Sequence, residues 1–201
     1  MSDKEQIQLL KNWWKQYGTS ILVGILAFAV VNFGWQYWNQ NKSQRTERAS
    51  LMYTQLLNIA DQDKNSEALL FEDHLIKDYA STPYASLAAL SSAKNAVVAG
   101  KLEVALDKLQ WVIKNSNVAG FRELARIRAA RILLEQKKPQ EALDLLAKID
   151  DSDFAAAIDE VSGDALVALG KNDLAKERYQ KAQQLSNGDA VSPFLKMKSE
   201  K

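Results

Sequence analysis

The pattern of hydrophobic and polar positions separates an N-terminal apolar segment from a longer region with helical periodicity. No charged residue lies between Lys15 and Lys42, and positions 21–31 are apolar throughout except for Gly24. At about 1.5 Å per residue, a helix over this uncharged stretch is about 39 Å long, more than the ~30 Å hydrocarbon core of a bilayer. The pattern therefore predicts a single transmembrane helix, which we place at residues 17–40.

Aromatic side chains gather at both ends of this stretch. They are Trp13, Trp14 and Tyr17 on one side and Trp35, Tyr37 and Trp38 on the other. Indole and phenol rings combine an apolar body with a polar group, so they prefer the headgroup level of a bilayer. Two alternatives compete with an anchor, namely a buried core helix and a signal peptide cleaved after the small-x-small sequence at 27–29. The hydrophobic and aromatic positions that continue past Ala29 favour a retained anchor.

The charges that flank the anchor do not decide its orientation. Three basic residues precede it and three follow it, so the count behind the positive-inside rule is tied. They are Lys4, Lys11 and Lys15, then Lys42, Arg45 and Arg48. A short N-terminal tail before a large domain is typical of a signal anchor. We therefore expect residues 1–16 to be a short cytoplasmic tail and residues 41–201 to form one domain across the membrane, with the opposite orientation as the alternative.

Beyond the anchor, apolar positions recur with the helical period, and no sustained strand-like alternation occurs. Pro83 and Pro139 suit the first position of a helix, where the missing N–H would have been unpaired. The pattern predicts helices over 42–60, 66–80, 83–98, 101–115, 121–137, 139–148, 153–169 and 171–185. Residues 186–201 read as a loop and a tail, with a short helix as an option at its end. The expected fold class is all-α.

Small residues recur at fixed offsets along these helices. One column holds Ala105, Ala142 and Ala175; twelve residues earlier lie Ala93, Ala130 and Gly163, and four residues later lie Leu109, Leu146 and Tyr179. Small side chains let two helices approach closely, and larger ones fill the seam against the next pair. The spacing of 37 and then 33 residues predicts helix pairs over 83–115, 121–149 and 153–185, with a degenerate pair at about 42–80.

This pattern resembles the tetratricopeptide repeat, which carries small, small, aromatic and alanine positions at these offsets. The resemblance implies a tetratricopeptide-repeat-like α-solenoid whose first helices line a concave surface. An irregular α bundle is the alternative.

Composition excludes several classes of function. The chain has no cysteine and one histidine, His74, so thiol chemistry and cysteine metal sites are excluded. Residues 42–201 hold 23 basic and 23 acidic side chains, and a neutral domain lacks the electrostatic footprint of nucleic-acid binding. No glycine-rich phosphate loop occurs. We expect neither an enzyme nor a cofactor or metal site.

Two groups of residues are candidate contact sites. Lys94, Arg126, Arg128 and Arg131 lie on predicted first helices and could attract an acidic partner segment, although a solvated helix face is the simpler interpretation. Ala29, Asn32 and Gln36 share one face of the anchor. Amide side chains are unfavourable in hydrocarbon unless they bond to another helix or reach interfacial water, so this face is a candidate contact within the membrane.

The chain as a whole resembles the YfgM family of ancillary SecYEG translocon subunits. The most specific part is the anchor ending Gly-Trp-x-Tyr-Trp-Asn at residues 34–39, followed by Ala-Ser-Leu-x-Tyr at residues 49–53. The resemblance implies a non-catalytic inner-membrane scaffold with its repeat domain in the periplasm. It also implies association with SecYEG and with PpiD, a membrane-anchored prolyl isomerase-like chaperone, and contact with translocating clients. The charge tie leaves a cytoplasmic-facing adaptor as the alternative.

Overall fold

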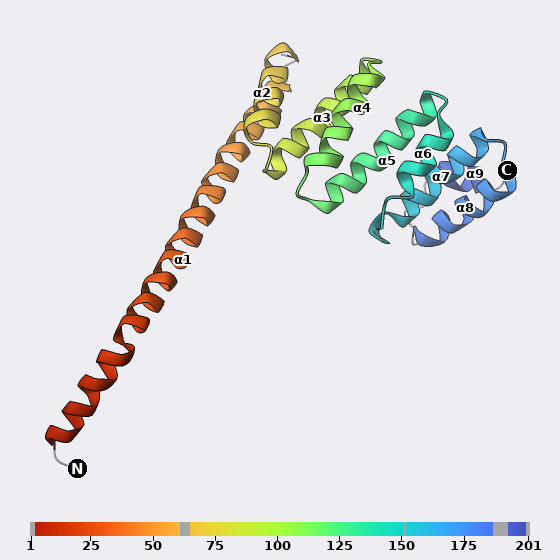
Figure 1. Cartoon of the computed structure of the whole chain (residues 1–201). Helices are drawn as coiled ribbons and strands as arrows, with labels where there is room; N and C mark the ends of the chain where they lie inside the picture. Colours follow the sequence, from red (N-terminus) through yellow and green to blue (C-terminus); the bar gives the residue numbers. More distant parts are fainter. Residues whose placement is uncertain (1–2, 61–64, 151, 187–192, 200–201) are drawn as a thin grey trace. The chain divides into compact units, whose positions relative to one another are not determined.

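The computed structural model describes residues 3–60, 65–150, 152–186 and 193–199, and these residues are almost entirely helical (Figure 1). The elements are α1 (Asp3–Ala60), α2 (Asn65–Asp78), α3 (Pro83–Val98), α4 (Leu102–Asn115), α5 (Ala119–Glu135), α6 (Pro139–Leu146), the 3-10 turn η1 (Ser152–Phe154), α7 (Ala155–Ala168), α8 (Asn172–Leu185) and α9 (Pro193–Ser199). No strand occurs within these ranges, so the all-α class is confirmed.

The chain divides into two units, Met1–Glu47 and Arg48–Lys201. The first unit consists of the N-terminal part of α1, whose apolar side chains are largely exposed; Phe28, Val30 and Phe33 are each 71% exposed. Among the described residues, one helix is long and apolar enough to cross a membrane, with its candidate stretch within Trp13–Ile59. The sequence predicted a separate helix from residue 42, whereas α1 continues to Ala60. Glycine and proline are both missing from residues 35–60, so no breaker ends the helix earlier.

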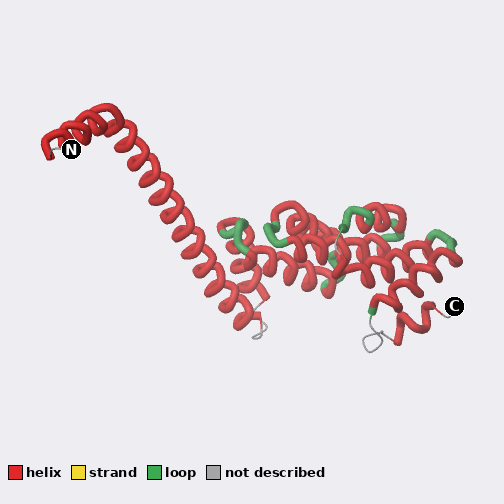
Figure 2. The backbone as a smooth tube through the Cα atoms, turned by 90° about the horizontal axis from the view of Figure 1, so that it is seen from below, coloured by secondary structure: helices red, strands yellow, loops and turns green. Residues whose placement is uncertain are grey.

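The second unit is a row of helix pairs (Figure 2), formed by α3 with α4, α5 with α6 and α7 with α8. Successive pairs are joined by contacts of α4 with α5 and of α6 with α7. The predicted small columns are buried: Ala105, Ala130 and Ala142 are each 0% exposed. The larger side chains four residues after the second-helix alanines are also buried, at 1% for Leu109 and 4% for Tyr179. The repeat register is therefore confirmed.

The turn inside each pair has one backbone geometry that the sequence showed in only two cases. Gly100 and Gly170 have φ of 71° and 73°, and Lys137 takes the same left-handed conformation with φ of 61°. In each turn the residue after this position donates its N–H to the carbonyl five residues back, as Lys138 does to Leu133 at 2.8 Å. This bonding satisfies the last carbonyls of the first helix. Lys137 adopts it with a Cβ, which strains its backbone.

The degenerate pair combines the end of α1 with α2. Ala49 and Leu56 pack with Ala68 and Leu75 in a small core that reaches Ala88 of α3. The short helix that the sequence allowed at the end of the tail is present as α9, beside α8.

Candidate interaction sites

The anchor places Ala29, Asn32 and Gln36 at successive turns of one helix. Asn32 and Gln36 are exposed, and Ala29 is partly exposed. Asn32 Nδ2 lies 3.4 Å from the Phe28 carbonyl oxygen of its own helix, to which it donates. Within the described residues no group donates a hydrogen bond to its amide oxygen.

The first helices of the three clear pairs carry charged residues at one equivalent position. Lys94, Arg131 and Asp164 each follow the small residue of their first helix, and we call the surface they mark the first-helix face. Lys94 and Arg131 are exposed, and Arg128, three residues before Arg131, is exposed on the same side of α5. The structure thus brings Arg128 and Arg131 together on the helix that follows the pair carrying Lys94.

Arg126 does not join this group. It lies five residues from Arg131, about 140° around the helix, and its side chain is only 18% exposed. Arg126 Nη1 donates to Glu123 Oε2, and Arg126 Nε is buried without a partner among the described residues. The acidic residue three positions earlier in the sequence was the available signal for this local ion pair. A pattern of arginines alone did not separate the paired residue from the exposed ones.

On the third pair the first-helix face is acidic, and a lysine of the same chain, Lys198, compensates its charge. Lys198 Nζ of α9 lies 2.7 Å from Asp164 Oδ1 and 3.3 Å from Glu160 Oε1. Tyr179 donates its hydroxyl to Asp164 Oδ1 at 2.8 Å, and burial together with this hydrogen bond raises the pKa of Tyr179. Arg131 Nη2 lies 3.9 Å from Glu160 Oε2. These contacts join residues at least fifteen positions apart, and no local spacing in the sequence predicts them.

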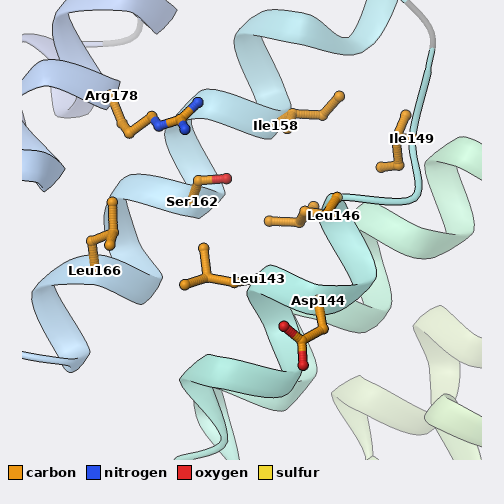
Figure 3. Close-up of a pocket in the computed structure, with 9 residues that line it drawn as sticks. Leu143, Asp144, Leu146, Ile149, Ile158, Ser162, Leu166 and Arg178 are labelled. Carbon is orange, nitrogen blue, oxygen red and sulfur yellow. The ribbon is translucent and has the colours of Figure 1, made fainter.

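A hollow of about 420 Å³ lies where α6, α7 and α8 meet (Figure 3). Its wall is mostly aliphatic, with Leu143 and Leu146 from α6 and Leu166 from α7. Arg178 at its edge donates from Nη1 to Asp159 Oδ1 at 2.8 Å, so its charge is already compensated by a buried carboxylate. The hollow exists because α6 ends at Leu146 and spans eight residues, whereas α4 and α8 span fourteen.

Within the ranges that the structure describes, no three His, Asp or Glu side chains gather closely enough to hold a metal ion. The described side chains form contact surfaces: amides on the N-terminal part of α1, cations on α3 and α5, and the acidic pair Glu160 and Asp164, which Lys198 of α9 contacts.

The second unit consists of helix pairs with buried columns of small residues, and it follows a helix of membrane-spanning length along the chain. These features define a tetratricopeptide repeat-like protein with a candidate N-terminal anchor. In agreement, the family described as tetratricopeptide repeat-like domain matches residues 11–201. The chain is 30% identical to an ancillary SecYEG translocon subunit of Aggregatibacter actinomycetemcomitans over 92% of this chain and 90% of that protein. Proteins with the same name from Haemophilus influenzae and Escherichia coli K12 are 27% and 23% identical, each over 98% of this chain and at least 95% of the relative.

No solved structure matches the chain. The chain belongs to the tetratricopeptide repeat-like family of ancillary SecYEG translocon subunits.

Proposed function

We propose that this protein is a non-catalytic, membrane-tethered subunit that associates with the SecYEG translocon of the inner membrane and holds its repeat domain in the periplasm. The observation that carries the proposal is similarity over nearly the whole chain, anchor included, to relatives named as ancillary translocon subunits. An apolar helix of spanning length before a helical repeat domain supports the same role. Repeat domains of this kind bind through extended surfaces and need no catalytic step.

The anchor and the repeat domain have different contact chemistry, so we assign them different partners. Asn32 and Gln36 suit an interhelical hydrogen bond in the membrane, which is worth about 0.6–2 kcal/mol. We assign this face to the translocon. Arg128 and Arg131 suit acidic segments of a soluble partner, because guanidinium groups bind carboxylates through two bonds, and Lys94 adds a further positive charge. We assign them to the chaperone PpiD or to translocating clients.

Orientation is tested by cysteine labelling, since the natural chain has no cysteine to give a background. Ser152→Cys is at an exposed site of the repeat domain, and Ser2→Cys lies on the other side of the anchor. A membrane-impermeant maleimide added from the periplasm should label Ser152→Cys and should leave Ser2→Cys unlabelled until the inner membrane is opened. The reverse result would replace the periplasmic scaffold with a cytoplasmic-facing adaptor.

Partner assignment is tested by co-purification of full-length variants. Asn32→Leu with Gln36→Leu should reduce SecYEG recovery about 3- to 30-fold, the ratio that corresponds to 0.6–2 kcal/mol. Val23→Leu with Val30→Leu, on the far side of the helix, is the matched control and should have no effect. Equal recovery from both variants would remove the anchor face from the proposal.

The cationic face is tested in the same assay. Arg128→Glu with Arg131→Glu should reduce chaperone recovery while SecYEG recovery is retained. Lys114→Glu with Lys148→Glu makes the same charge change at exposed sites elsewhere on the domain and is the control. We leave Arg126 unchanged, because a carboxylate there would face Glu123 in a partly buried site. Undiminished recovery of both partners would mean that these arginines are only a solvated surface.

A further inference from the structure

The last helix, α9, covers a face of α7 and α8 that combines an apolar patch with an acidic pair. Leu195 is 4% exposed and packs in one cluster with Leu166 of α7 and Tyr179 of α8. Lys198, three residues later and so on the same side of α9, lies 2.7 Å from Asp164 and 3.3 Å from Glu160. One aliphatic side chain and one cation of α9 thus contact this face, and Figure 1 shows α9 beside α7 and α8.

The acidic pair is positioned by the repeats themselves. Asp164 accepts the Tyr179 hydroxyl at 2.8 Å, which orients its carboxylate. Glu160 is 3.9 Å from Arg131 of the preceding pair. The Tyr179 ring is 5.7 Å from Lys198 Nζ and gives the ammonium group an aromatic face. All of these groups except Lys198 belong to α5, α7 or α8, so the receiving surface is built without α9.

The covering helix itself is minimal. It spans seven residues, whereas isolated helices shorter than about 12 residues are marginal in water. Its helical state therefore depends on docking. Helix α9 contacts α8 in the way that α5 contacts α4, so it takes the position of the first helix of a further pair. Within the described residues, no second helix follows α9. A surface that would receive the next repeat is thus covered by a short helix.

We propose that the face formed by Glu160, Asp164, Leu166 and Tyr179 is a binding site for a short amphipathic helix of a partner protein, and that α9 is its resident occupant. The partner segment carries an aliphatic residue followed three positions later by lysine, the chemistry with which α9 fills the site. It binds by replacing α9. A segment with a carboxylate at the lysine position is rejected, because it would meet two like charges. This inference does not depend on the association with SecYEG.

Because α9 is part of the same chain as its binding site, a free partner segment must compete with it. A segment of the same chain has a high effective concentration at its site. Free segments of similar affinity therefore bind poorly while α9 is docked. Undocking α9 removes this competition and should reveal the site.

The test uses the full-length protein in detergent and a fluorescein-labelled peptide with the sequence of Pro193–Ser199. Leu195→Asp with Lys198→Glu undocks α9 by placing carboxylates against the apolar patch and the acidic pair. Fluorescence anisotropy should show that this variant binds the peptide at least tenfold more tightly than the natural chain. A peptide that carries Leu195→Asp should not bind to either protein.

The acidic pair is tested in the undocked background. Adding Glu160→Gln with Asp164→Asn should weaken peptide binding at least fivefold and should reduce its sensitivity to salt. Asp173→Asn with Glu177→Gln neutralises two exposed carboxylates elsewhere on α8 and should leave binding unchanged. Equal weakening by both pairs would overturn the proposal, because it would indicate attraction by net charge alone.

The natural chain provides a measurement that needs no variant. Hydrogen–deuterium exchange of the α9 amides should accelerate when millimolar unlabelled peptide is added, because the displaced helix loses its hydrogen bonds. If the undocked variant fails to melt cooperatively, this measurement decides the question. Unchanged exchange of α9 at saturating peptide, or equal peptide affinity of the natural chain and a folded undocked variant, would overturn the proposal.

Discussion

Gly163→Ala should destabilise the repeat domain, although alanine is the residue that the two preceding pairs use at this position. A Cβ on Gly163 would lie 2.7 Å from Tyr179 Cδ1 and 2.9 Å from its Cζ, and closer still to Cε1. The ring cannot retreat freely, because it is 4% exposed and its hydroxyl donates to Asp164 at 2.8 Å. Alanine and leucine form the same contact in the earlier pairs, as Ala130 and Leu146 do.

The magnitude follows from three opposing effects. Overpacking costs about 2 kcal/mol, and distortion of the Tyr179 hydrogen bond costs about 1 kcal/mol. The higher helix propensity of alanine offsets about 1 kcal/mol of this loss in the free energy of unfolding. The net loss of about 2 kcal/mol corresponds to a fall of about 4–8 °C in the melting temperature of a domain of this size. Circular dichroism of the full chain in detergent, followed during heating, measures it.

A second substitution makes the test specific. Gly163→Ala with Tyr179→Leu recreates the alanine–leucine pair of the earlier repeats, so the clash disappears. Tyr179→Leu alone should cost about 1–2 kcal/mol through the lost ring volume and hydrogen bond. The double variant should be more stable than the sum of the single losses by about 2 kcal/mol, the coupling expected for residues in contact.

A control in another repeat distinguishes packing from propensity. Ala130→Gly makes the opposite exchange at the equivalent position and should also destabilise, by about 1 kcal/mol or more, because alanine fits there. A stabilising Gly163→Ala, together with strictly additive behaviour of the double variant, would refute the reasoning. It would show that helix propensity and not the ring contact determines the residue.

Three further predictions test the core and the turns. Glu72 is 3% exposed, and its Oε2 has no hydrogen-bond partner in the part of the chain that the structure describes. Burial raises the pKa of Glu72 despite a hydrogen bond from Ser92. The folded protein therefore loses stability as the pH rises from the unfolded pKa of Glu72 through its folded pKa, because the ionised carboxylate is unfavourable in the core. Glu72→Gln should raise the free energy of unfolding by about 1 kcal/mol at pH 7 and by little at pH 4. Urea unfolding at both pH values measures this difference. Residues 137 and 100 both have left-handed φ, which favours glycine. Lys137→Gly should therefore stabilise the domain by up to about 1 kcal/mol, whereas Gly100→Ala should destabilise it by about 1 kcal/mol. Melting temperatures that shift in the same direction for both variants would contradict this. Ala142→Trp should cost more than about 1 kcal/mol by overpacking a position that is 0% exposed, and a neutral result would contradict the repeat register.

The features that could be predicted from the sequence are those with a short period. Apolar positions repeating every three or four residues located the helices, and Pro83 and Pro139 do begin α3 and α6. The small columns located the pairs, because close helix approach requires small residues at fixed offsets. The predicted ends of α5 and α6 are each two residues too late, since the final turn that closes a helix depends on backbone bonding that periodicity does not encode.

The features that could not be predicted depend on long-range neighbours. The sequence grouped Arg126 with Arg128 and Arg131, but burial and Glu123 separate it from them. Lys137 takes a glycine conformation because the helices on either side of it fix the turn, and a lysine gives no sign of this. Lys198 reaches residues 34 and 38 positions earlier, and only the fold places α9 beside α7. The sequence therefore showed which side chains are charged or polar, but it did not show which of them contact each other.

The charges along the first-helix face give its two ends opposite selectivity within a domain of balanced net charge. Lys94 and Arg128 have no partner among the described residues, so that end attracts carboxylates. Glu160 and Asp164 at the other end attract cations, and Lys198 already satisfies this attraction. Arg131 joins the two ends through its 3.9 Å contact with Glu160. When Lys198 leaves, Glu160 loses a cation and holds Arg131 more strongly, which draws that guanidinium away from an acidic partner. Binding of a basic helix that restores the lysine contact should therefore leave the affinity for an acidic segment unchanged, whereas an empty acidic site should lower it.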